Sequence, residues 1–382
     1  YKMTSLHFTN ARILTRREMF EGDLVTAGGV ITAISGHAPV AKHDVIDLGG
    51  DYLLPGLIEI HTDNLERNIL PRPGVVWPSI LASAIAHDVQ IIGSGITTVF
   101  DALAIGGLRE GGLDARIFDE SFSAISLGQE KKLFKADHLL HLRCEVSDAQ
   151  MAGQLEKYGT HHLVKLISVM DHTPGQRQWT DLEKWRLYHR DKRWTDEQAE
   201  QVRLERLELQ RKYAGHNRIR AIRFARDRQI NLASHDDTTV QDAEESARAG
   251  ITISEFPTTL PASRAAKKNG MAVIMGSPNV VRGGSHSGNV SAMELAAHGL
   301  LDGLSSDYVP SSLLQAVFTL AGKVSLQLPD AVAMISANIA RMIGLEDRGE
   351  IAIGQKADLV QITLVDNLPV VRRVWRDGVQ VA

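Results

Sequence analysis

Histidines and carboxylates stand at the ends of several short apolar stretches. His61 and Asp63 close "LPGLIEIHTD" (54–63), and Glu145 ends the apolar run of "HLLHLRCEV" (138–146). His172, His235, Glu255 and Asp307 follow comparable stretches later in the chain. Imidazole and carboxylate ligands without thiolates suit Zn²⁺, Mn²⁺ or Fe²⁺ and leave positions open for water. The pattern therefore predicts a divalent metal site, although some of the carboxylates would serve equally well to orient the histidines.

The alternation of side chains along two of these stretches supports a shared site. In a strand, Glu59, His61 and Asp63 would lie on one face, as would His141, Arg143 and Glu145 in the second stretch. Burying such charges inside a protein is costly unless a metal ion or a partner compensates them. Cys144 falls on the apolar face, which predicts an unreactive packing residue.

A second group of residues is suited to anions. The segment "GSPNVVRGGSHSGN" (276–289) combines glycines with Arg282, Ser285 and His286, and it also reads as a plain flexible loop. Backbone N–H groups and arginines bind phosphate oxygens. Arg72, Arg143 and Arg177 also fall near predicted strand ends, so we predict a substrate-binding set of Arg72, Arg143, Arg177, Arg282, Ser285 and His286. Ser285 and His286 lack an oriented third partner, which argues against a serine hydrolase.

The fold that would bring these residues together is a (β/α)8 barrel of the α/β class. Eight apolar stretches between 52 and 308 alternate with helix-forming sequence, and parallel strands joined in this way close into a barrel or form an open doubly wound sheet. Both termini are rich in Val, Ile, Thr and Gly, typical of short strands and turns. We therefore predict a small β-domain from 1–52 plus 345–382, and a barrel at 53–344.

One connection of the predicted barrel is unusually long. Residues 176–228 are highly charged and helix-forming, and they follow the fourth strand, on the side where a barrel keeps its active site. A solvated helical hairpin is the simplest interpretation. Trp179, Trp185 and Trp194 indicate that part of the insertion packs against other side chains.

The overall composition indicates which classes of binding partner and which cellular location are expected. The chain has 382 residues, 43% hydrophobic and 23% charged, with a formal net charge of −4, which does not favour nucleic acid or an anionic membrane. Cys144 is the only cysteine, so no intrachain disulfide can form and a reducing, cytoplasmic location is predicted. Residues 1–20 lack the apolar core of a signal peptide, and no apolar run is long enough to cross a bilayer.

Taken together, the motifs resemble the amidohydrolase superfamily. "LPGLIEIHTD" is similar to its first-strand metal motif, and "IAIGQKADLV" (351–360) to the segment that returns the chain to the small β-domain. The set "HTDNLE", "PRPGVVWP", "HLRCE", "DHTPGQRQ", "SHDD", "EFPTT", "VRGGSHSGN" and "LSSDY" resembles one diphosphatase branch more specifically, over residues 5 to 380. That likeness implies hydrolysis of a methylphosphonate-bearing ribose 5-triphosphate to the 5-phosphate and pyrophosphate.

The resemblance also implies roles for individual residues. The implied metal ligands, for one or two ions with zinc favoured, are His61, Asp63, Glu145, His172, His235 and Asp307. Among them, Glu145 takes a bridging position, and Asp307 holds the attacking water and accepts its proton. Asp63 and Glu255 stand where many relatives have histidines. Lys165 precedes His172 by seven residues, roughly 23 Å along a straight strand, so it is not expected to share the site.

Two other functions stay open on sequence alone. The commoner chemistry of the superfamily is hydrolysis of an amide, imide or amidine C–N bond. An apolar substrate pocket would favour that reaction, whereas a pocket with several arginines favours a phosphate substrate. A non-catalytic scaffold would have lost metal ligands that this chain keeps. The expected partner is a small-molecule sugar triphosphate, and assembly into a homo-oligomer is also open.

Overall fold

The computed structural model describes residues 5–35, 44–106, 115–189, 192–285, 288–324 and 326–382. The chain divides into two units: residues 1–100, 124–138 and 303–382 form the first, and residues 101–123 with 139–302 form the second. Three elements run across this division: β7 (Ile96–Ile105), α3 (Ala115–Glu130) and β8 (Asp137–Glu145). No helix of the described residues is long and apolar enough to span a membrane.

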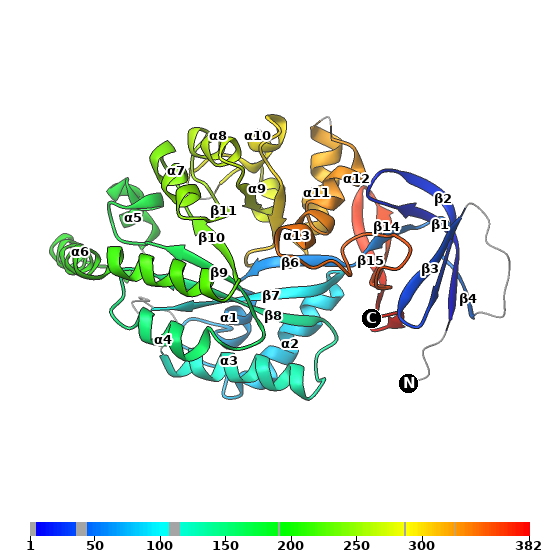
Figure 1. Ribbon diagram of the computed structural model, residues 1–382, viewed down its shortest axis with the longest axis horizontal. Coiled ribbons are helices and arrows are strands. Elements are labelled where there is room, and N and C mark those ends of the chain that lie inside the picture. Colours follow the sequence, from blue (N-terminus) through cyan, green and yellow to red (C-terminus); the bar gives the residue numbers. More distant parts are fainter. Residues whose placement is uncertain (1–4, 36–43, 107–114, 190–191, 286–287, 325) are drawn as a thin grey trace. The chain divides into compact units, whose positions relative to one another are not determined.

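In the first unit, both ends of the chain contribute to one mostly antiparallel sheet (Figure 1). Its strands follow the order β16-β15-β14-β5-β1-β2-β3, and β4 also pairs with β1. The bounds are β1 (Leu6–Leu14), β2 (Met19–Ala27), β3 (Val30–Ser35), β4 (Asp44–Asp47), β5 (Tyr52–Pro55), β14 (Leu359–Val365), β15 (Leu368–Arg376) and β16 (Val379–Gln380). Phe8 and Trp375 are fully buried and meet edge to face, with ring centroids 4.9 Å apart, so the two termini share one core.

The second sheet carries the predicted barrel. Its eight strands are hydrogen-bonded in the order β13-β12-β11-β10-β9-β8-β7-β6. The remaining bounds are β6 (Leu57–Thr62), β9 (Val164–Met170), β10 (Asn231–His235), β11 (Ile253–Glu255), β12 (Ala272–Gly276) and β13 (Gly303–Ser305). A parallel bridge between Thr62 and Asp307 joins the two end strands of this order. The fold is therefore the predicted (β/α)8 barrel and not the open sheet.

Helices connect the barrel strands or, in the case of α11 to α13, follow the last of them. In the first unit these are α1 (Asn64–Ile69), α2 (Ile80–Gly93), α11 (Ser312–Lys323), α12 (Leu328–Ala333) and α13 (Ala337–Met342). In the second unit they are α4 (Met151–Tyr158), α5 (Leu182–Tyr188), α6 (Asp196–Asp227), α7 (Val240–Arg248), α8 (Leu260–Lys268), α9 (Ser277–Arg282) and α10 (Ala292–Ala297), with the short 3-10 helix η1 (Arg177–Trp179).

The stretch 52–62, which has the composition of one apolar strand, forms two strands. β5 belongs to the terminal sheet and β6 to the barrel, with Gly56 between them. A Cβ at Gly56 would lie 2.2 Å from Thr97 Oγ1, so only glycine fits where the chain passes from one sheet to the other. β6 ends at Thr62, and Asp63 has φ −94° and ψ 9° at the start of α1. The strand alternation therefore stops before Asp63, and the predicted shared face is limited to Glu59 and His61.

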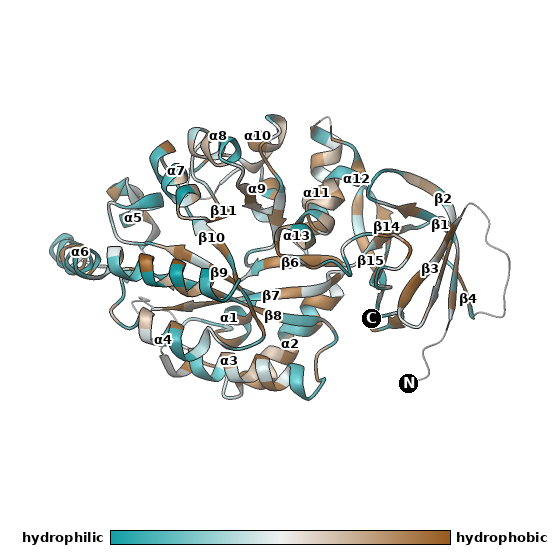
Figure 2. Cartoon of the chain, viewed as in Figure 1, coloured by the Kyte–Doolittle hydropathy of each residue, from teal (hydrophilic) through white to brown (hydrophobic). Residues whose placement is uncertain are grey.

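The long insertion is helical, as predicted. α6 begins with a capping box in which Thr195 Oγ1 accepts from Gln198 N and the Gln198 side chain accepts from Thr195 N. Figure 2 shows α6 as mostly hydrophilic, with apolar positions in between. The tryptophans pack on one another: Trp179 and Trp185 are buried with Ala199, and Trp194 lies against them, its ring centroid 5.8 Å from that of Trp185.

Candidate metal centre

Two neighbouring barrel strands of the second unit deliver histidines to the same end of the sheet. β9 and β10 run parallel, with Val169 paired to Ser234. His172 follows β9 by two residues, and His235 is the last residue of β10. Asp236 comes next, in a left-handed conformation with φ 57°. Because the carboxyl ends of parallel strands lie together, these three side chains converge.

The atoms that converge are those a metal ion would need. Asp236 Oδ2 lies 3.6 Å from His172 Nε2 and 3.6 Å from His235 Nε2. The three groups offer ligand atoms that all lie within 4.8 Å of one another. Zinc bonds of about 2.0–2.1 Å in tetrahedral geometry place neighbouring ligand atoms roughly 3.3 Å apart, which is close to the observed spacing.

The carboxylate of Asp236 is suited to bind a cation. Its Oδ2 is buried and has no hydrogen-bond partner among the described residues. A buried carboxylate oxygen without a partner is costly unless a cation compensates it. The donor set of two imidazoles and one carboxylate therefore fits Zn²⁺ or a similar divalent ion.

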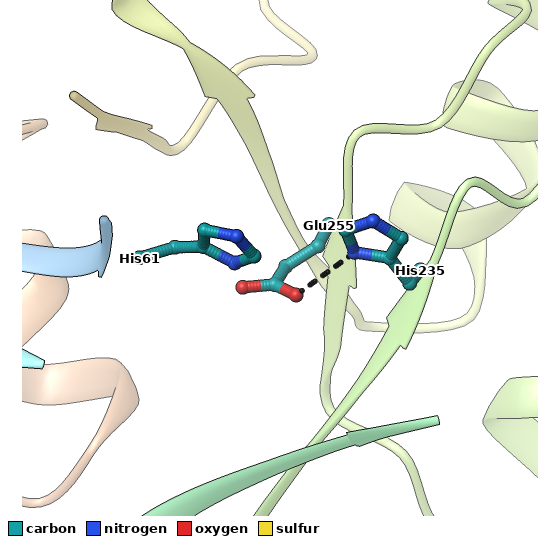
Figure 3. Close-up of side chains that lie close together, drawn as sticks. All are labelled: His61, His235 and Glu255. Carbon is teal, nitrogen blue, oxygen red and sulfur yellow. Dashed lines mark hydrogen bonds and ion pairs between the residues drawn. The ribbon is translucent and has the colours of Figure 1, made fainter. Parts of the chain in front are cut away.

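Each of the two histidines is held from behind by a glutamate. His172 Nδ1 lies 2.8 Å from Glu145 Oε2. His235 Nδ1 lies 3.3 Å from Glu255 Oε2, the contact drawn in Figure 3. A carboxylate on one ring nitrogen fixes the ring so that the other nitrogen can bind a metal. Glu145 also accepts from Ser147 Oγ at 2.7 Å, which fixes the carboxylate in turn.

Neighbouring charges shift the pKa values of His172, Glu145 and Asp236. Burial works against a charged imidazole at His172, but the carboxylates of Asp236 and Glu145 outweigh it and raise its pKa to about 9. Burial likewise opposes ionisation of Glu145, and His172 outweighs it, so the pKa of Glu145 is lowered. The pKa of Asp236 is also lowered, since the neighbouring histidines outweigh its burial. Both acids are thus ionised at neutral pH and contribute negative charge beside the two imidazoles.

Glu255 lies between two histidines. Its Oε1 is 3.8 Å from His141 Nδ1, in addition to the contact of Oε2 with His235. His141 Nε2 is 2.9 Å from Ser168 Oγ. All of these side chains are buried. The polar face predicted for β8 therefore does point into a polar network, and Cys144 on the same strand is buried, which raises its thiol pKa well above the usual range.

In the first unit, backbone hydrogen bonds link the predicted ligands at the ends of β6 and β13. Asp307 N donates to His61 O at 3.2 Å, and Asp63 N donates to Asp307 O at 2.9 Å. Glu59 accepts from His61 N at 2.7 Å and from Ser306 N at 2.5 Å. Burial raises the pKa of Glu59 to about 8. The predicted ligands His61, Asp63 and Asp307 are therefore neighbours within this unit, held by backbone hydrogen bonds, and their binding of metal stays a prediction.

Arg177 contacts two acidic side chains. Its Nη1 pairs with the fully buried Asp237 and lies 3.3 Å from Asp242 Oδ1. Asp237 Oδ2 also accepts from Ser234 Oγ at 2.5 Å. This network ties the start of the insertion to the loop after β10, which carries Asp236. The predicted contact of Arg177 with substrate phosphate stays a prediction.

The other predicted substrate residues are spread along the chain. Arg143 is 9% exposed on β8, whereas Arg72 and Arg282 are exposed. Ser285 is half-buried, and His286 lies outside the described residues. The segment after β12, taken for a loop, begins with the helix α9, of which Arg282 is the last residue. Lys165 is exposed on β9, consistent with its exclusion from the site.

Asp236 and Asp237 were missed by sequence reasoning. Only His235 was singled out in "LASHDD", because strand alternation gives no direction for residues beyond the strand end. The one available signal was the run of two acids directly after a candidate ligand.

Similarity to known proteins agrees with this fold. Residues 195–382 match the Amidohydrolase family. The chain is 44% identical over 375 residues to the alpha-D-ribose 1-methylphosphonate 5-triphosphate diphosphatase of Escherichia coli (strain K12), covering 97% of this chain and 99% of that protein.

Solved structures share the fold at low identity. A Xaa-Pro dipeptidase with bound methionine has a TM-score of 0.68 at 14% identity, covering 99% of this chain and 100% of that one. An N-acetylglucosamine-6-phosphate deacetylase from Pasteurella multocida has a TM-score of 0.62 at 13% identity, covering 99% of this chain and 100% of that one. The resemblance inferred from the motifs is thereby confirmed, and the chain belongs to the amidohydrolase family.

Proposed function

We propose that this protein is a metal-dependent diphosphatase that hydrolyses α-D-ribose 1-methylphosphonate 5-triphosphate to the 5-phosphate and pyrophosphate. The observation that carries the proposal is the 44% identity to the Escherichia coli diphosphatase, which extends over 97% of this chain. The group of His172, His235 and Asp236, in which His172 is half-buried and the other two are buried, supports the metal dependence. The cytoplasmic location predicted from the single cysteine stays a prediction.

His172, His235 and Asp236 are proposed to hold a divalent ion, most simply Zn²⁺, with Glu145 and Glu255 orienting the two imidazoles. His61, Asp63 and Asp307 are proposed as further ligands on the strength of their motifs, which leaves room for one ion or two. Such an ion, when bound, polarises phosphoryl oxygens and acidifies a water molecule. This assignment gives Glu145 an orienting role in place of the bridging one that the motifs implied.

Asp307 is proposed to accept the proton of the attacking water. Its backbone is fixed by hydrogen bonds to His61 and Asp63, so little rearrangement is needed to present the carboxylate. Arg143, buried on β8, would donate to phosphate oxygens, with Arg72, Arg282 and Ser285 helping to hold the polyphosphate. Phosphoryl transfer depends mainly on such positioning and charge compensation.

Product analysis by ³¹P NMR tests the reaction. The metal-free protein is loaded with Zn²⁺, Mn²⁺ or Fe²⁺ and given the ribose 5-triphosphate, ATP, and a panel of amides, imides and amidines. We expect the sugar 5-phosphate and pyrophosphate in equal amounts, with ATP a poorer substrate. Hydrolysis of a C–N bond without triphosphate turnover would favour the rival enzyme class. No turnover of anything with any of the three metals would favour a binding scaffold.

Elemental analysis tests the proposed ligands. His172→Ala should lower the metal bound per chain and abolish turnover, because it removes one of three converging ligand atoms. His216→Ala is the matched control, since His216 is exposed on α6. Full metal content in His172→Ala would remove His172 from the site.

A further inference from the structure

One face of α6 is exposed along nearly the whole helix. Residues on this face recur every three or four positions from Glu197 to Ile219, and Arg226 follows seven positions later, beyond the buried Ile222. This spacing places them in a single stripe. The stripe consists of Glu197, Gln201, Leu204, Glu208, Arg211, Gly215, Ile219 and Arg226, and every one of these residues is exposed. At about 1.5 Å per residue, a helix of this length extends roughly 48 Å.

The two halves of the stripe carry opposite charge. Glu197 and Glu208 lie in the first half, where a shallow groove of about 750 Å³ is lined by further acids and by Leu204. Arg211 lies beside the midpoint of the helix, and Arg226 lies in the second half. Each half also exposes one large apolar residue: Leu204 is 53% exposed and Ile219 is 66% exposed. The helix macrodipole favours such charges only within the terminal turns, so it does not account for the whole pattern.

We propose that α6 is a self-association surface on which a second copy of this chain docks its own α6 in antiparallel orientation. Leu204 and Ile219 lie equally far from the midpoint between Arg211 and Lys212, as do Glu197 and Arg226. An antiparallel pair with its two-fold axis at that midpoint therefore sets Leu204 against Ile219 of the second copy. It sets Glu197 against Arg226 of the second copy, and the symmetry repeats each contact.

The centre of the pairing is compatible with close approach. Glu208 faces Gly215 of the second copy, and a Cβ built at Gly215 meets nothing within 4 Å in the chain itself. Near the axis, Lys212 faces Arg211 of the second copy, which brings two positive charges together. Glu208 lies one helical turn from Lys212, so its negative charge can offset them. A parallel pair would oppose acid to acid and base to base. A uniformly acidic or basic partner would fit only one half, so a second copy is the occupant that satisfies both.

Sedimentation equilibrium of the full chain tests the surface. The interface is narrow and polar, so we expect a dissociation constant of roughly 1–100 µM that weakens as salt rises from about 0.05 to 0.5 M. Glu197→Arg alone and Arg226→Glu alone should each raise the dissociation constant about tenfold or more, since each creates two like-charge contacts. The double variant should restore dimerisation, because the exchanged charges again face each other.

Two further variants make the result decisive. Arg226 also donates to Ala249 O at 3.1 Å, so Leu204→Ser serves as an independent substitution that should weaken the dimer without touching that bond. Lys268→Glu, exposed on α8, is the control and should leave it unchanged. A chain that stays monomeric at about 200 µM and low salt overturns the proposal. So does a dimer that the single substitutions leave intact, or a double variant that does not recover.

Discussion

Replacing Glu145 with Gln separates the two roles considered for this residue. The structure sets Glu145 Oε2 2.8 Å from His172 Nδ1, which is an orienting contact, whereas the motif comparison implied a metal bridge. Gln keeps the length of the side chain and one oxygen that can accept from His172 Nδ1. The substitution therefore removes the negative charge but spares the hydrogen bond.

The expected magnitude follows from that difference. A hydrogen bond to a charged group contributes about 1.5–3 kcal/mol and a neutral one about 1, so the change costs roughly 0.5–2 kcal/mol of metal binding. At about 1.4 kcal/mol per factor of ten, Glu145→Gln should weaken metal affinity about 2- to 27-fold. Glu145→Ala also removes the hydrogen bond and should reach the upper part of the 10- to 100-fold range, roughly, that is typical of such partners.

Competition with a chromophoric chelator measures both affinity and stoichiometry. The protein is stripped of metal and titrated with Zn²⁺ in the presence of the chelator. Glu156→Gln is the control, because Glu156 is an exposed glutamate that pairs with Arg220 in the same unit. If Glu145→Gln lowers the number of ions bound per chain, Glu145 is a ligand and the orienting role is wrong. An affinity within twofold of the wild-type value would mean that the contact with Glu145 contributes nothing to the site.

Three further predictions concern the base, a proton and a buried acid. Asp307→Asn should lower kcat about 10²–10⁴-fold with a smaller loss of bound metal, measured by turnover and elemental analysis; near-normal turnover with metal bound would remove Asp307 from the mechanism. The pKa of His172 is about 9 without metal, so Zn²⁺ binding should release a proton. Apparent affinity should then rise about tenfold per pH unit towards pH 9, and calorimetry in two buffers of different ionisation enthalpy should detect that proton; identical heats would contradict the assignment. Burial raises the pKa of Asp358 to about 6, above its value in the unfolded chain. The free energy of unfolding therefore falls as the pH rises towards about 6, and the loss is complete above that pH. Asp358→Asn should therefore add about 1–2 kcal/mol to the free energy of unfolding at pH 7.5 and little at pH 4, as measured by urea titration; an equal gain at both would contradict the linkage.

The barrel was predictable because each of its strands is an apolar stretch bounded by turn residues, with helical sequence between most of them. The break at Gly56 was not. β5 and β6 read as one apolar run, since residues buried in the terminal sheet and in the barrel have the same composition. What separates them is the close approach of Thr97 to Gly56, and that contact comes from a strand about 40 residues further along the chain.

The candidate site was predictable in its residue types and less so in its roles. His172 and His235 are identifiable because a histidine at or just after the end of an apolar strand often has a functional role. Whether Glu145 binds an ion or a histidine depends on ångström-scale placement, and residue type alone does not carry that information. The same holds for Arg177: its basic character suggested a phosphate, and the structure sets it beside the buried Asp237.

Asp236 shows why the missed residues lie just past the strands. A left-handed φ of 57° turns its backbone away from the strand direction, which is uncommon for a non-glycine residue and for which aspartate is favoured. Its N–H donates to Glu255 O at 2.9 Å, so the neighbouring strand holds the turn in place. The turn brings Oδ2 to the same side as the Nε2 atoms of both histidines. Asp236 thereby gains its position from tertiary hydrogen bonding and not from strand periodicity, and the backbone strain is retained at the one place where a converging carboxylate is useful.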